Sequence, residues 1–125
     1  MKILSLDYGT KHIGMAKWNS EVDVVLPFGV ANNLDEIIQL AKQEKFDKIV
    51  VGMPYSAQNK NIYSSNTERV IEFIKKLKDS LDIEINTLDE RFSSQQADRM
   101  GGEASRDEKS AMVILEGYLA KNKIL

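Results

Sequence analysis

Three short apolar runs, separated by turn residues, occupy the first 26 positions of the chain. Each run is too short for a helix, so each predicts a β-strand. The three predicted strands cover residues 3–6, 15–18 and 22–26. The first ends at Asp7, where Asp-Tyr-Gly-Thr indicates a turn. Pro27 and Gly29 interrupt the chain after the third, and because Pro27 has no N–H to donate, we expect that strand near an edge of the sheet.

Four later segments have the spacing of helices. They cover residues 34–46, 65–81, 93–100 and 105–119. Asn33 can cap the first, and the pairs Ser65 with Glu68 and Ser105 with Glu108 have the spacing of capping boxes. The apolar positions of the second segment fall on one helical face, which makes it the most regular of the four.

Two more apolar runs lie between these helices, at residues 49–51 and 83–88. Apart from the short segment 93–100, the predicted order is therefore β-β-β-α-β-α-β-α. Three strands in a meander followed by two crossover units predict an α/β fold, with a mixed five-stranded sheet and flanking helices. The chain shows neither a repeat nor a linker, so we expect residues 1–125 to form a single domain.

Composition narrows the class of protein. The chain has 125 residues, no Cys, one His, 17 Lys and Arg, and 19 Asp and Glu, which gives a net charge of -2. Disulfides and cysteine metal sites are excluded. No cationic leader and no apolar run of roughly 20 residues is present, so we expect a cytoplasmic protein without a membrane partner. A net charge near zero argues against a strongly basic, histone-like nucleic-acid-binding protein. It does not exclude a local patch of basic residues.

Three acidic residues stand at the ends of predicted elements instead of on polar helix faces. Asp7 follows the first strand, Glu90 follows the fifth, and Asp107 lies in the first turn of the last helix. Open α/β sheets bind their ligands just beyond the carboxyl ends of their strands. Asp7 and Glu90 each follow a strand, so we expect them to lie close together there. Asp107 joins them if its helix begins beside the sheet.

Carboxylates in such a cluster need a proton or a cation. Two of them about 5 Å apart repel by roughly 3 kcal/mol at an effective dielectric near 20. All-oxygen ligands suit Mg²⁺ or Mn²⁺, and a pair of such ions can promote in-line hydrolysis of a phosphodiester. Each acid also has a simpler interpretation: an Asx turn for Asp7, a helix-dipole contact for Asp107, and a surface ion pair with Arg91 for Glu90.

Candidate contacts to a phosphate surround these acids. Gly9 lets the backbone approach a ligand, Thr10 can donate hydrogen bonds, and Lys11 supplies a positive charge. His12, the single histidine, can transfer protons, although a histidine in a turn is more often a surface residue. Arg91 directly follows Glu90, and solvation of a polar surface explains it equally well.

Taken together, four stretches of the sequence resemble the YqgF (RuvX) family of small ribonuclease H-like proteins. They are Asp-Tyr-Gly-Thr-Lys-His-Ile-Gly-Met-Ala at 7–16, Val-Gly-Met-Pro at 51–54, Leu-Asp-Glu-Arg-Phe-Ser-Ser at 88–94, and the segment 107–119. The resemblance implies a ribonuclease H-like fold and makes Asp7, Glu90 and Asp107 the catalytic, metal-binding carboxylates. His12 departs from the family pattern, which commonly has Arg at that position, and this bears on substrate contacts.

The resemblance implies a two-metal-ion nuclease, and the leading hypothesis is cleavage of structured RNA at the 5′ end of pre-16S rRNA, with the ribosome as a partner. One alternative is a resolvase of four-way DNA junctions, a substrate that favours a homodimer over a monomer. A second is a binding module for nucleic acid or ribosomes without catalysis. Asp-x-Gly-Thr is also similar to the phosphate loop of sugar kinases, but a single domain cannot close over ATP as those enzymes do.

Overall fold

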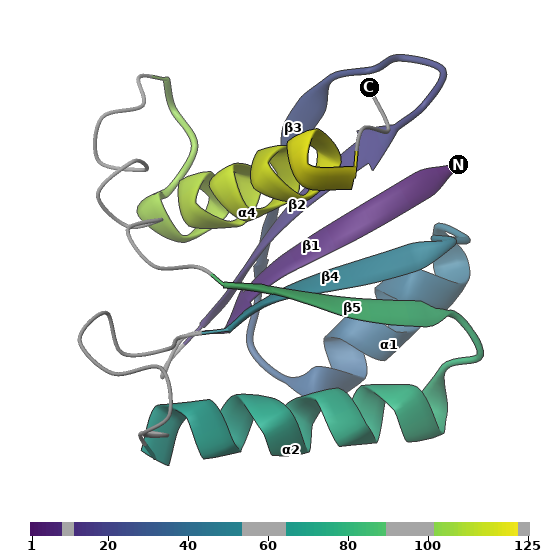
Figure 1. Cartoon of the computed structure of the whole chain (residues 1–125), viewed down its shortest axis with the longest axis vertical. Coiled ribbons are helices and arrows are strands. Elements are labelled where there is room, and N and C mark those ends of the chain that lie inside the picture. The colour runs from purple at the N-terminus through teal and green to yellow at the C-terminus, as the bar shows by residue number, and fades with distance from the viewer. Residues whose placement is uncertain (9–11, 54–64, 90–101, 123–125) are drawn as a thin grey trace.

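The computed structural model describes residues 1–8, 12–53, 65–89 and 102–122. Eight elements are assigned in these ranges (Figure 1). In chain order they are β1 (Lys2–Tyr8), β2 (Ile13–Asn19), β3 (Val25–Ala31), α1 (Leu34–Gln43), β4 (Lys48–Met53), α2 (Ser65–Ser80), β5 (Glu84–Asp89) and α4 (Arg106–Asn122). Their order confirms the predicted β-β-β-α-β-α-β-α sequence. The short helix predicted at 93–100 lies outside the described residues.

The five strands form one mixed sheet in the order β3-β2-β1-β4-β5. The two hairpins, β1 with β2 and β2 with β3, are antiparallel. The two crossover units make β1, β4 and β5 parallel to one another. This confirms the predicted meander followed by two βα units. It also brings the carboxyl ends of β1, β4 and β5 to a single edge of the sheet.

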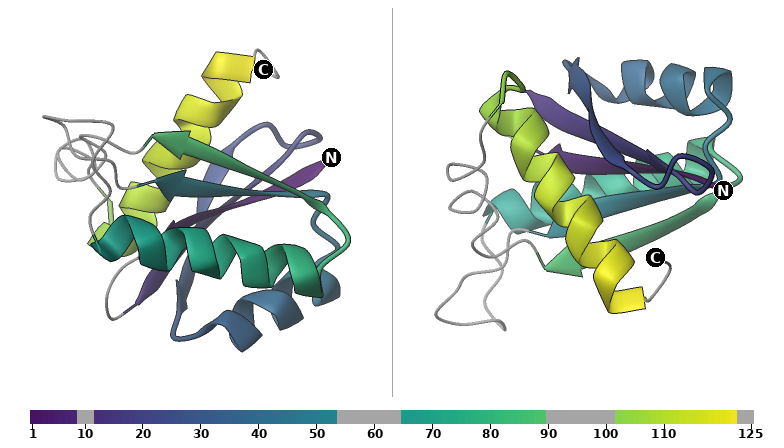
Figure 2. Two further views of the ribbon diagram at one scale, coloured as in Figure 1. Left: turned by 60° about the horizontal axis from the view of Figure 1, so that its bottom comes forward. Right: turned by 90° about the horizontal axis from the view of Figure 1, so that it is seen from above.

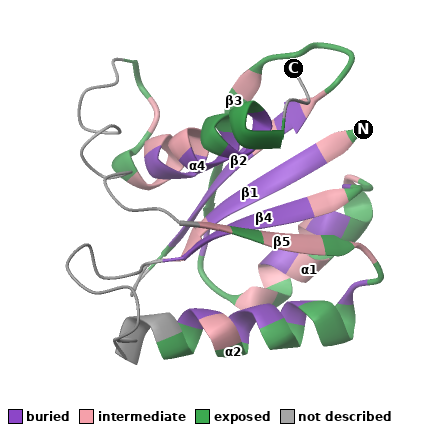
Figure 3. Ribbon diagram, in the orientation of Figure 1, coloured by how far each residue is buried: buried purple, intermediate pink, exposed green. Residues whose placement is uncertain are grey.

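Helices cover both faces of the sheet, and β1 divides its side chains between them. Leu4 and Leu6 point into the larger core, where α1 and α2 pack, whereas Ile3 joins the smaller core under α4. Figure 2 shows α4 crossing one face while α1 and α2 lie on the other. The three inner strands β1, β2 and β4 are mostly buried, whereas the edge strand β3 is largely exposed (Figure 3). The period-two pattern of β1 thus sets which of its residues face α4.

The third strand departs from its prediction. It was expected at 22–26 but runs from Val25 to Ala31, because the chain first turns at Asp23. Asp23 has a φ of 56°, and its Oδ1 accepts a 3.0 Å hydrogen bond from the indole N–H of Trp18. Pro27 lies within β3 at the edge of the sheet, which confirms the expected edge position.

The first helix is shorter than the expected range 34–46. Asn33 caps it as predicted, since its side chain accepts the N–H of Glu36 at 3.0 Å. Helical dihedrals end at Glu44, and Lys45 adopts a φ of 56°, a left-handed conformation that stops the helix. This turn allows Phe46 to pack in the larger core. None of the helices in the described ranges is long and apolar enough to cross a membrane.

Candidate active site

Asp7 occupies the second-last position of β1, directly opposite Gly14 of β2. Directly paired residues of antiparallel strands have Cα atoms about 4.5–5.5 Å apart and project their Cβ positions from the same face. Ile3, on the same face of β1 by strand alternation, packs in the core beneath α4. The Asp7 side chain therefore projects toward α4, and it is half-buried.

Asp107, in the first turn of α4, also lies next to Gly14, because Gly14 has no side chain to occupy that space. A Cβ added at Gly14 would lie 2.0 Å from the carbonyl oxygen of Asp107 and 2.9 Å from its Cβ. The backbone of Asp107 thus packs directly on the residue that pairs with Asp7. The structure brings together two of the three predicted carboxylate residues, one on a strand and one in the first turn of a helix.

A buried hydrogen bond farther along the same strand fixes this alignment. Ser5 is fully buried, and its hydroxyl donates to the carbonyl of Ala111 at 2.7 Å. Ser5 lies two residues before Asp7, and Ala111 lies four residues after Asp107. Two residues of a strand span about 6.6 Å, and four residues of a helix span about 6 Å. The distance along β1 from Ser5 to Asp7 therefore matches the distance along α4 from Ala111 to Asp107. Strand β1 and helix α4 run in opposite directions here and meet again at Asp7 and Asp107.

The first turn of α4 is held by the predicted capping box. The N–H of Ser105 donates to Oε1 of Glu108 at 3.0 Å, and the N–H of Glu108 donates to the Ser105 hydroxyl at 3.2 Å. The second oxygen of Glu108, Oε2, accepts the N–H of Gly29 in β3 at 2.8 Å. Burial raises the pKa of Glu108, but the hydrogen bonds from Ser105 and Gly29 outweigh it and lower that pKa overall. Glu108 is therefore held as an anion beside Asp107.

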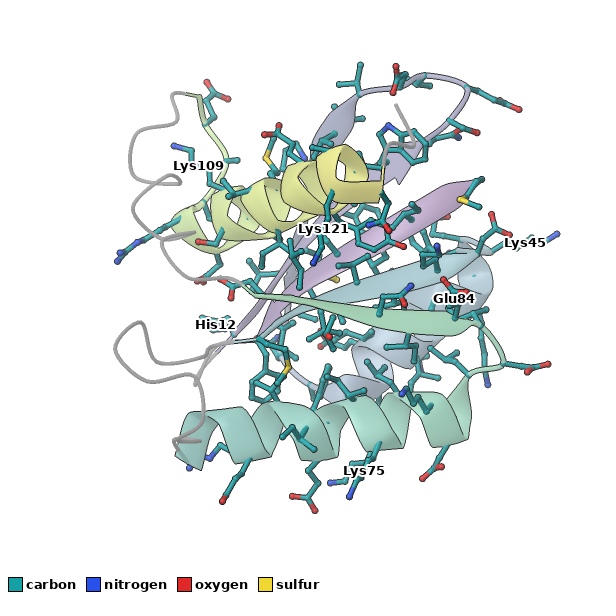
Figure 4. The ribbon with its side chains drawn as sticks, viewed as in Figure 1. His12, Lys45, Lys75, Glu84, Lys109 and Lys121 are labelled. Carbon is teal, nitrogen blue, oxygen red and sulfur yellow. The ribbon has the colours of Figure 1, made fainter. Side chains whose placement is uncertain are left out.

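His12 lies at the same end of the sheet and is exposed (Figure 4). It immediately precedes Ile13, which pairs with Tyr8 at the end of β1. Its Nδ1 is 3.3 Å from Oδ1 of Asn32, and the backbone N–H of Asn32 donates to Glu36 at 2.9 Å. Asn32 therefore orients the imidazole ring and leaves Nε2 available to a ligand.

Five predicted site residues lie outside the described part of the chain. They are Gly9, Thr10, Lys11, Glu90 and Arg91. Within residues 1–8, 12–53, 65–89 and 102–122, no group of three or more His, Cys, Asp or Glu side chains is placed to hold a metal ion. Of the three predicted metal-binding carboxylate residues, Asp7 and Asp107 are described, and carboxylate oxygens are hard donors of the kind that Mg²⁺ and Mn²⁺ prefer.

Sequence reasoning did not identify two residues that build this site. Gly14 was part of a recognised motif, but only its packing against Asp107 shows why a side chain is excluded there. Glu108 was identified as a helix cap, whereas its bond to Gly29 depends on how α4 crosses β3. The spacing from Ser105 to Glu108 predicts that Glu108 caps the helix. It does not predict that the second carboxylate oxygen of Glu108 binds Gly29.

Comparison with solved structures defines the fold class. RuvC of Thermus thermophilus superposes with a TM-score of 0.65 at 8% identity, covering 98% of this chain and 97% of that one. The same protein in complex with a Holliday junction substrate gives the same TM-score at 6% identity, with 98% and 96% covered. The chain therefore has the ribonuclease H-like fold of RuvC, as the sequence predicted.

Sequence comparison then identifies the family. Residues 1–121 match the RuvX family, whose description is Holliday junction resolvase. A relative from Desulforamulus reducens, provisionally named a pre-16S rRNA nuclease, is 33% identical over 134 residues, covering 95% of this chain and 96% of its own. A similarly named relative from Bacteroides fragilis is 31% identical over 140 residues, with 98% and 99% covered. The chain belongs to the RuvX family.

Proposed function

We propose that the chain is a metal-dependent nuclease that hydrolyses phosphodiester bonds of structured RNA, at the 5′ end of pre-16S rRNA. The observation that carries this proposal is the meeting of Asp7 and Asp107 on one face of the sheet, with Gly14 between them. Membership of the RuvX family and the names of the relatives support the nuclease and the RNA substrate. We further propose that the protein works in the cytoplasm and associates with ribosomes.

Asp7 and Asp107, with Glu90 as a third ligand, are the residues that would hold Mg²⁺ or Mn²⁺. When bound, a pair of such ions lowers the pKa of a water nucleophile and neutralises charge on the leaving oxygen. The protein contributes a fixed arrangement of carboxylates. Asp7 is held by the β1–β2 pairing, and Asp107 is held by packing on Gly14 and by the capped start of α4.

Substrate contacts are proposed for the residues around the turn that follows β1. Gly9, Thr10, Lys11 and Arg91 would bind the phosphate backbone, through backbone N–H groups and positive charge. His12 would donate a hydrogen bond from Nε2 to a phosphate oxygen as the imidazolium, because Nδ1–H is already donated to Oδ1 of Asn32 and only the protonated ring has a second N–H. An imidazole in place of the family's arginine shortens the reach of this contact and removes its bidentate geometry.

Cleavage assays with a single substitution test the proposal. The purified protein should cut an RNA spanning the 5′ end of pre-16S rRNA when Mg²⁺ or Mn²⁺ is present, and the Asp7→Asn variant should lose at least about 100-fold in rate, a typical cost of removing a group that stabilises the transition state. Asp79→Asn removes an exposed carboxylate of α2 and serves as the matched control. Equal cleavage by the wild type and Asp7→Asn would rule out the proposed role of Asp7.

Resolution of four-way DNA junctions is the second candidate function. The description of the RuvX family and the shared fold with RuvC favour it. A resolvase must cut two symmetric positions, so it should act as a homodimer, whereas an RNA-processing enzyme can act as a monomer. Cleavage of a synthetic junction and of the RNA precursor under the same conditions separates the two. Faster cutting of the junction, with two symmetric incisions, would favour the resolvase.

A further inference from the structure

Glu108 uses both of its carboxylate oxygens, and each oxygen serves a different element. Oε1 accepts the N–H of Ser105, which completes the capping box of α4. Oε2 accepts the N–H of Gly29 at 2.8 Å, a residue of β3 that lies 79 positions earlier in the chain. The side chain therefore joins the first turn of α4 to the edge strand of the sheet, and its neighbour in that turn is Asp107.

The donor on β3 is available because the strand bulges there. Gly29 has a φ of 86°, and the register of β2 with β3 shifts between Gly14 and Ala16. A bulge leaves its extra residue without a partner on the neighbouring strand. The freed N–H of Gly29 is donated to Glu108 instead. The bulge lies directly beyond Gly14, the residue on which the main chain of Asp107 rests.

We propose that Glu108 is a positioning residue, which fastens the first turn of α4 to the β3 bulge and so holds Asp107 beside Asp7 for metal binding. The proposal rests on the nuclease function proposed above. Two contacts on neighbouring strands fix the turn: Gly14 of β2 supports the backbone of Asp107, and Gly29 of β3 binds the carboxylate of Glu108. Residues that orient metal ligands in this way typically change metal affinity 10- to 100-fold when they are replaced.

A simpler interpretation is that Glu108 acts only as a helix cap, and the variant Glu108→Gln distinguishes the two. Glutamine is an equally good partner in a capping box, so its oxygen keeps the bond from Ser105. Its amide then presents N–H to the N–H of Gly29, and two donors repel. Glu108→Gln thus breaks the link to β3 and preserves the cap. Ser105→Ala has the opposite effect, because it removes a cap bond and preserves the link.

Calorimetric titration with Mn²⁺ and RNA cleavage at increasing Mn²⁺ test this proposal on the full chain. We expect Glu108→Gln to bind Mn²⁺ about 10-fold more weakly than wild type. Its cleavage rate should recover when Mn²⁺ is raised about 10-fold. Ser105→Ala should keep the wild-type Mn²⁺ affinity, as should Glu116→Gln, which removes an exposed carboxylate elsewhere on α4. Asp107→Asn should lose binding that excess metal does not restore.

The outcomes separate this proposal from the proposed function. Wild-type Mn²⁺ affinity in Glu108→Gln, together with lost binding in Asp107→Asn, would overturn the role of Glu108 and leave the nuclease intact. Equal weakening in Glu108→Gln and Ser105→Ala would show that only capping matters, and would also overturn it. If neither the wild type nor Asp107→Asn binds Mn²⁺, the metal-dependent function itself is wrong and the positioning role falls with it.

Discussion

Gly14 has no side chain, and the main chain of Asp107 occupies the space that one would fill. A residue without a functional group thus determines how closely the first turn of α4 approaches the strand pair that carries Asp7. Asp7 depends on it through strand pairing and Asp107 through packing. At the scale of single residues, the candidate site depends on the close packing of the Asp107 main chain on Gly14 as well as on its acidic residues.

Gly14→Ala should therefore damage the site and the fold together. The new methyl group would lie 2.0 Å from the Asp107 carbonyl oxygen, so α4 must move away from β2. We expect a loss of about 1–3 kcal/mol in the free energy of unfolding, typical of overpacking, and a loss of Mn²⁺ binding. Urea denaturation and calorimetry measure the two effects.

Gly117→Ala is the control for that substitution. Its Cβ would meet only a side-chain methyl of Leu88, at 3.2 Å, and alanine favours a helix interior by up to about 1 kcal/mol over glycine. Stability and Mn²⁺ affinity should stay close to those of the wild type. If Gly14→Ala behaves like Gly117→Ala, the packing of Asp107 on Gly14 is not required.

At the scale of elements, α4 is attached to the sheet at both of its ends. Its first turn is bonded to β3 through Glu108, and Tyr118, near its last turn, is bonded to β4 and β5. The Tyr118 hydroxyl is 2.8 Å from Nζ of Lys48 and 3.3 Å from the amide of Asn86. Lys48 also forms a 2.8 Å ion pair with Glu84 across the parallel strands.

The ion pair predicts how stability varies with pH. The hydrogen bond from Lys48 to Glu84 raises the pKa of Lys48. The same bond, together with the hydrogen bond from Asn86, lowers the pKa of Glu84. A lowered carboxyl pKa contributes stability above the ordinary value of 4.5, and this contribution is lost as pH falls through the folded-state pKa. The raised pKa of Lys48 contributes below 10.5 and is lost at higher pH.

Glu84→Gln should lower the Tm by a small amount at pH 7, because the Glu84 side chain is 60% exposed and solvent screens the pair. The difference from wild type should shrink below pH 4.5 and in high salt. Thermal melts monitored by circular dichroism across this pH range measure it. Glu72→Gln, which removes an exposed carboxylate of α2, is the control. A Tm difference for Glu84→Gln that is constant with pH would contradict the assignment.

At the scale of the whole molecule, the sequence predicted the order of elements and the mixed sheet, because apolar periodicity and crossover rules are local or topological. It also predicted Asp7 and Asp107 as site residues, because both stand at the ends of elements, and the structure places both beside Gly14. It misplaced β3 because the turn at Asp23 and the bulge at Gly29 are stabilised by Trp18 and Glu108, contacts that form only in the fold. The metal-binding roles assigned to Asp7, Glu90 and Asp107 stay predictions.

Asp7 and Asp107 are proposed to belong to one metal site at the carboxyl ends of the parallel strands. The most direct test is a Mn²⁺ titration followed by the line widths of backbone amide signals in NMR spectra. The seven residues of β1 span roughly 20 Å from one end of the sheet to the other. We predict that the signals of Asp7, Gly14 and Asp107 broaden first, while that of Val22, beyond the opposite end of β1, persists. Broadening centred away from Asp7 and Asp107, or no selective broadening at all, would contradict a shared metal site at these two residues.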